Sequence, residues 1–198
     1  MPPPRRAEAV LPRPPSLEVL RAASLGEAEL AAELIALYVQ TFDASPGTRG
    51  TLRQLDYRTL TRWLNAVAAL DLDSNYALQL ALLYSRVNDR SKKHQMFEFI
   101  HTAFLQNPNR RWRALAEASV LARHELADLP LALRFAESLE RHATGPDVPG
   151  WAQQMRILLF ADIGERERAR VVLGALIASG RINQPHELRL LEERLLIP

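Results

Sequence analysis

The chain of 198 residues contains no cysteine. Disulfide bonds, thiolate catalysis and cysteine-ligated metal sites are therefore excluded. Two of its 25 basic residues are lysines, Lys92 and Lys93, and the others are arginines. Either codon bias in a GC-rich bacterial genome or selection for two-pronged contacts to anions explains this preference. The lack of cysteine fits an oxidising or a reducing compartment equally well.

The chain also lacks long apolar runs and a large net charge. No run reaches the ~18 residues that a transmembrane helix needs, and residues 1–15 have no apolar stretch that could act as a signal peptide. A formal net charge of +2 is too small to drive binding to nucleic acids or membranes. A hydrophobic fraction of 47% is ordinary for soluble proteins, and this length can bury a sizeable core.

Proline divides the chain into two predicted parts. Residues 2–15 hold six prolines and few side chains to bury, so we expect residues 1–15 to form an extended or disordered arm, or a docking peptide. From Ser16 on, helical spacing dominates, and residues 16–198 are predicted to form a single domain. No segment shows sustained two-residue alternation, so no sheet is expected.

The polar breaks predict about ten helices with short connections. Their expected ranges are 16–23, 27–42, 56–70, 74–87, 91–106, 109–126, 130–142, 149–163, 165–179 and 185–195. The last is expected to cap the array, and residues 43–53 to form a loop.

Two of these helices have a clear apolar stripe. In helix 27–42, residues at three- and four-residue steps predict the stripe Leu30, Leu34, Leu37, Tyr38 and Thr41. Ala31, Ala32 and Ala36 permit close approach of a neighbouring helix. In helix 56–70 the expected stripe is Leu60, Trp63, Leu64 and Val67.

One pattern occurs three times: a polar break, a helix, a short polar turn and a second helix. The breaks lie at 73–76, 107–109 and 149–151, and the turns at 88–89, 127–128 and 163–165. Asn75 to Asn109 is 34 residues, and Trp112 to Trp151 is 39. Periods of this length are typical of helical-hairpin arrays, whose units bury their apolar faces by stacking.

These positions resemble degenerate tetratricopeptide repeats over residues 27–179. The first resembling unit contains Ala77, Ala81, Tyr84, Met96, Ile100, Ala103 and Pro108. The second contains Trp112, Ala116, Ala132, Phe135 and Leu139, and the third Trp151, Gly164, Ala169, Leu173 and Leu176. Residues 27–70 read as a fourth, worn hairpin with a long internal loop.

The resemblance implies an all-α, right-handed solenoid of stacked antiparallel hairpins that binds a protein or peptide in its concave groove. In that family the first helix of each hairpin lines the groove. The corresponding candidates are Asn75, Gln79, Arg86, Arg113, Glu117 and Arg156. Their mixture of charges suggests an extended, partly acidic ligand held by arginine–carboxylate pairs.

Residues 15–26 also resemble bacterial repeat proteins that carry a membrane anchor just upstream. That resemblance implies an accessory subunit of a bacterial complex, in which this chain is a portion that follows the anchor. Self-association is a separate alternative that stays open, because worn repeats often keep one exposed apolar flank.

Two alternative functions remain open. His94, Glu98 and His101 share one helix face and could ligate a metal for catalysis, or form a solvated polar face. Arg110, Arg111, Trp112 and Arg113 could bind RNA, or Trp112 could be a core residue with arginines around it. No nucleophile elbow, phosphate loop or His-Glu-x-x-His motif occurs, which favours a non-enzymatic function without a cofactor.

Overall fold

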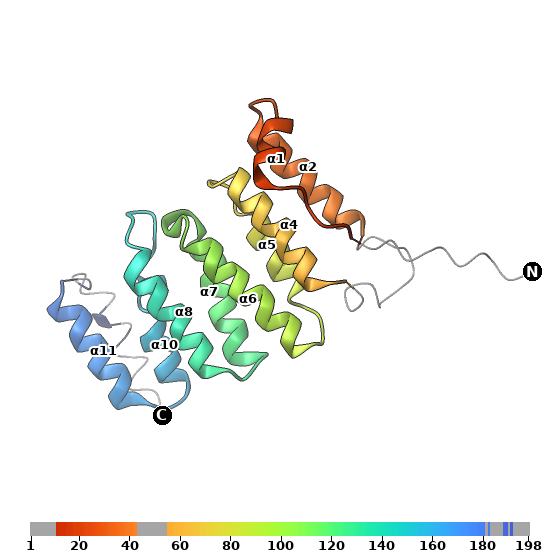
Figure 1. Ribbon diagram of the computed structural model, residues 1–198. Coiled ribbons are helices and arrows are strands. Elements are labelled where there is room, and N and C mark those ends of the chain that lie inside the picture. Colours follow the sequence, from red (N-terminus) through yellow and green to blue (C-terminus); the bar gives the residue numbers. More distant parts are fainter. Residues whose placement is uncertain (1–10, 43–54, 181, 183–187, 190, 192–198) are drawn as a thin grey trace, which may run out of the picture. The chain divides into compact units, whose positions relative to one another are not determined.

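The computed structural model describes residues 11–42, 55–180, 182, 188–189 and 191. Within these residues the chain is all-helical, with ten helices and no strand (Figure 1). The predicted all-α class is therefore confirmed. Its internal contacts group it into two compact units, residues 1–103 and 104–198. None of the described helices is both long enough and apolar enough to cross a membrane.

The first unit is built around α4. Its helices are α1 Leu17–Ala23, α2 Ala28–Thr41, α4 Tyr57–Leu70, α5 Tyr76–Tyr84 and α6 Arg90–Phe104, whose last residue falls in the second unit. α1, α2 and α5 each pack against α4. The α2–α4 contact confirms that residues 27–70 contain a packed helix pair. The predicted loop at 43–53 lies outside the described residues.

Polar side chains begin two of these helices where the sequence predicted. The Ser16 hydroxyl accepts a hydrogen bond from the Val19 amide at 3.4 Å, and the Asp56 carboxylate accepts one from the Arg58 amide at 3.0 Å. Both bonds satisfy amides that have no partner inside the helix. Gly26 adopts a left-handed φ of 98° between α1 and α2, a conformation that glycine adopts without strain.

The predicted apolar stripe of α4 is confirmed, since all four of its residues are buried: Leu60, Trp63, Leu64 and Val67. The indole N–H of Trp63 donates to the Pro12 carbonyl at 2.7 Å, and Leu11 is buried. Residues 11–15 are non-helical, and at Pro12 they are fastened to α4. The rest of the predicted arm, residues 1–10, lies outside the described residues.

The predicted apolar stripe of α2 is wrong for its three leucines, whereas Tyr38 of the same stripe contacts Trp63 of α4 with a ring-centroid distance of 5.5 Å. Leu30, Leu34 and Leu37 are 53%, 57% and 53% exposed. The buried residues of α2 are instead Ala32, Ala36 and Val39. Both faces are apolar, and the small side chains let α2 approach α4 closely, so packing density outweighs side-chain size.

The second unit is a series of helices that pack on their sequence neighbours. They are α7 Pro108–His124, α8 Leu129–His142, α9 Gly150–Gln153, α10 Met155–Asp162 and α11 Arg166–Ala178. α7 packs on α8, α8 on α10, and α10 on α11 (Figure 1). Short connections between packed helices make α7–α8 and α10–α11 helical hairpins. Their turns match the predicted breaks at 127–128 and 163–165.

The predicted continuous helix at 149–163 is a further error. It is interrupted at Gln154, which separates α9 from α10 and has φ −93° and ψ 7°. Such dihedrals lie outside the helical range. No proline or glycine lies between 151 and 163, so the sequence contains no local signal for the interruption.

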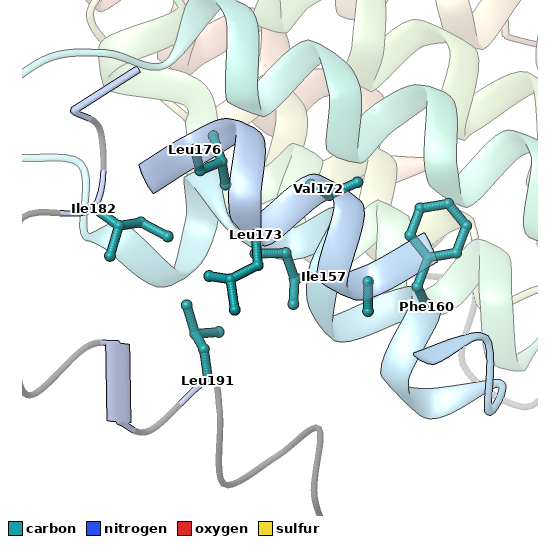
Figure 2. Packing of buried hydrophobic residues seen from close by; sticks show 8 residues of the cluster. Ile157, Phe160, Val172, Leu173, Leu176, Ile182 and Leu191 are labelled. Carbon is teal, nitrogen blue, oxygen red and sulfur yellow. The ribbon is translucent and has the colours of Figure 1, made fainter. Parts of the chain in front are cut away.

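The α10–α11 hairpin has a compact apolar core. Ile157 and Phe160 come from α10, and Val172, Leu173 and Leu176 from α11, with Ile182 and Leu191 beyond them (Figure 2). Gly180 has a left-handed φ of 72° just after α11, a conformation that commonly follows the end of a helix and that glycine adopts without strain. Most of the predicted capping helix, 185–195, lies outside the described residues.

Candidate binding groove

An open pocket of about 330 Å³ lies in the second unit between α7 and the α9–α10 segment. Seven residues line it: Trp112, Arg113, Ala116, Glu117, Val120, Trp151 and Met155. The α7 residues recur at three- and four-residue steps, so they form one face of that helix. The pocket, called the tryptophan groove below, is therefore built by one helix face and the segment that follows α8.

The two tryptophans make the apolar part of the tryptophan groove. Their ring centroids are 5.4 Å apart and the ring planes meet at 73°, an edge-to-face contact. Trp112 is 4% exposed, whereas Trp151 is 47% exposed. Trp112 thus belongs to the core, and Trp151 presents an aromatic surface to solvent. The interruption at Gln154 lies between Trp151 and Met155, so both helix pieces contribute a side chain to the pocket.

Charges of both signs lie on the rim. The Arg113 guanidinium is 4.6 Å from the centroid of the Trp112 ring, within range of a cation–π interaction. Glu117 is exposed one helical turn further along α7. Among the described residues, no carboxylate forms an ion pair with Arg113, so its guanidinium edge is available to an acidic ligand.

Two side chains of α7 hold the segments that follow it in the sequence. The Ser119 hydroxyl donates to the Ala132 carbonyl on α8 at 2.9 Å. The Asn109 side chain accepts from the Gly145 amide at 2.8 Å, which ties the loop after α8 to the first turn of α7. These bonds tie α7 to α8 and to the loop that follows α8.

The structure brings two of the six groove candidates together. Arg113 and Glu117 line the tryptophan groove. Arg156 instead forms an ion pair with Glu140 at 3.2 Å and does not line it. Asn75, Gln79 and Arg86 lie in the first unit, on or beside α5, and are not among the lining residues. For these six residues a binding role stays a prediction.

Five of the seven lining residues are absent from the predicted groove set. Trp112 and Ala116 were predicted only in other roles, and no groove position was predicted for Val120, Trp151 or Met155. Trp151 was recognised only as the aromatic of a repeat, which implies a buried position. Val120 lies one further turn along the Arg113–Glu117 face, and that spacing was the available signal. Met155 gave none, because its place depends on the interruption at Gln154.

The arginines around Trp112 do not form one surface. Arg111 is fully buried and its guanidinium donates to the Gln106 side chain at 3.1 Å. Arg110 and Arg113 are exposed. Successive residues point about 100° apart around a helix, so the four-residue run is divided between core and solvent.

Of the three predicted metal ligands, His94, Glu98 and His101, the first two lie close together. His94 and Glu98 approach to 3.3 Å on the surface of α6. Nowhere in the described residues do three histidine or acidic side chains form a group that could hold a metal ion. His94 and Glu98 thus lie at a solvent-exposed surface, and a metal-binding role for this face stays a prediction.

Comparisons with known proteins give no relative. No family model, curated protein or solved structure matches the chain. The resemblance to tetratricopeptide repeats therefore stays a prediction from the residues, and functional inference depends on the geometry.

Proposed function

We propose that this chain is a non-enzymatic interaction scaffold that binds a protein or peptide segment in the tryptophan groove. Its hairpins would be tetratricopeptide-like units of a right-handed solenoid, serving as an accessory subunit of a bacterial complex. The observation behind the proposal is an open pocket with an exposed tryptophan wall and an arginine whose guanidinium edge has no carboxylate partner among the described residues.

The lining residues indicate the chemistry of the ligand. Trp151, Val120 and Met155 favour an apolar or aromatic side chain, since burial of such a group is the main source of affinity in a pocket. Arg113 adds a charge-assisted bond to an aspartate or glutamate near that anchor. Tryptophan and arginine are the residue types most enriched at binding hot spots.

The chain allows a sharp test with a random peptide library displayed on phage. Peptides selected on the full chain should combine an apolar anchor with a neighbouring acid. Trp151→Ala should weaken their binding by about tenfold or more, since hot-spot truncations cost at least about 2 kcal/mol. The readout is fluorescence anisotropy of the labelled peptides.

A matched control is available on α8. The Arg134 guanidinium lies 5.4 Å from the Phe135 ring, an arrangement like that of Arg113, but Arg134 is not a lining residue. Arg134→Glu should leave peptide binding unchanged. If the selected peptides bind Trp151→Ala as tightly as the wild type, the tryptophan groove is not the ligand site.

A further inference from the structure

The first unit has an exposed leucine strip on the outer side of α2, formed by Leu30, Leu34 and Leu37. Each of the three is more than half exposed. Their spacing of four and then three residues is the a and d spacing of a coiled-coil seam. Leu25, in the turn before α2, is also exposed, at 91%. α2, orange in Figure 1, therefore has a second apolar face besides the one that packs on α4.

The size of the leucine strip suits a single helix. α2 has 14 residues, which is about 21 Å at 1.5 Å per residue. Leu30, Leu34 and Leu37 form one row of side chains along it, with Tyr38, 40% exposed, beside the row. A stable interface between globular partners buries about 800 Å² on each side, more than one such row offers. An amphipathic helix lying along the row would cover it fully.

Charge beside the leucine strip indicates the partner's chemistry. Glu29 and Glu33 are exposed. Glu29 precedes Leu30, and Glu33 lies between Leu30 and Leu34. When residues are placed 100° apart around the helix, both glutamates fall on the same edge of the strip. α2 contains no basic residue. Neither glutamate forms an ion pair within the described residues. An unneutralised acidic edge beside an apolar seam is complementary to lysine or arginine at the flanking positions of a partner helix.

We propose that the leucine strip of α2 is a docking surface for a basic amphipathic helix of a partner protein. The partner's leucine-like residues pack between Leu30, Leu34 and Leu37, and its basic residues pair with Glu29 and Glu33. A second copy of the chain fits less well, because antiparallel pairing would bring the two acidic edges together. The surface is separate from the tryptophan groove.

Three synthetic helical peptides test this on the full chain. The first has leucine at a and d and lysine at the flanking positions, the second has glutamate in place of lysine, and the third has the first peptide's composition with its leucines off the seam. The lysine peptide should bind at least about tenfold more tightly than the other two in anisotropy titrations. Equal affinity for the lysine and glutamate peptides would overturn the proposal.

Variants of α2 place the binding site. Leu34→Glu should lower the affinity for the lysine peptide by about tenfold or more. The double variant Glu29→Lys and Glu33→Lys should bind the glutamate peptide more tightly than the lysine peptide. Leu34→Ala is the alternative variant if circular dichroism shows that Leu34→Glu has lost helix. Undiminished binding by these variants would contradict the proposal.

Two controls distinguish peptide binding at the leucine strip from binding elsewhere on the chain and from self-association. Leu105→Glu changes another exposed leucine and should leave binding unchanged, as should Trp151→Ala, so failure here and failure of the tryptophan groove can be told apart. Light scattering of the free chain should give a monomer mass at all concentrations. A dimer that Leu34→Glu abolishes would mean that a second copy covers the strip, and would overturn the proposal.

Discussion

At the scale of single residues, Asp56 shows how one side chain sets the start of a helix. Its carboxylate accepts from the Thr59 hydroxyl at 2.7 Å and from the Arg58 amide at 3.0 Å. The Thr59 hydrogen bond is the largest of the causes that hold the pKa of Asp56 below its ordinary value of 3.8. Hydrogen bonds to the charged form favour ionisation, so the folded state prefers the carboxylate.

Asp56→Ala should lower the free energy of unfolding by about 1 kcal/mol at pH 7. Because the folded pKa is depressed, the stabilisation is complete above the unfolded pKa and is lost as the pH falls below 3.8 through the folded value. The cost of the substitution should therefore shrink in acid. Urea denaturation of both proteins at neutral pH and at about pH 3 measures it.

Asp56→Asn is the matched control, since the amide oxygen still caps the helix but does not titrate. This variant should keep most of the stability at neutral pH. An Asp56→Ala cost that is the same at both pH values would contradict the role of the carboxylate charge.

At the scale of elements, helix positions were largely predictable from the sequence and helix faces were not. Caps and breaks such as Ser16, Asp56 and Pro108 lie in the chain itself, so most boundaries fell within a few residues of the structure. α2 has alanines on one side and leucines on the other, and periodicity cannot tell which of two apolar faces packs. The interruption at Gln154 has no local signal at all.

The two faces of α2 should respond oppositely to substitution. Ala36 is fully buried, so Ala36→Leu should overpack the contact with α4 and destabilise by about 1–3 kcal/mol. Leu34→Ala, on the exposed leucine strip, should change stability by no more than about 0.5 kcal/mol. Thermal or urea unfolding of the two variants gives the comparison. Greater destabilisation by Leu34→Ala would mean that the leucine face packs in solution.

At the scale of the whole molecule, the chain has two compact units with a separate candidate surface on each. Two of the seven residues that line the tryptophan groove could be predicted, because Arg113 and Glu117 share a helix face that spacing reveals. Trp151 and Met155 join them only through the packing of α9 and α10 beside α7, a tertiary fact that no local pattern encodes. The same reason explains why Arg156 does not line this groove, since its pairing with Glu140 depends on how α10 meets α8.

The central claim is that Arg113 and the tryptophan groove bind an acidic segment with an apolar anchor. The most direct measurement is the dissociation constant of one library-selected peptide, and of its acid-to-lysine counterpart, for the wild type and for Arg113→Glu. Arg113→Glu should raise the dissociation constant of the acidic peptide by about tenfold or more and lower that of the lysine peptide. Dissociation constants that do not change with the charge at position 113 would contradict it.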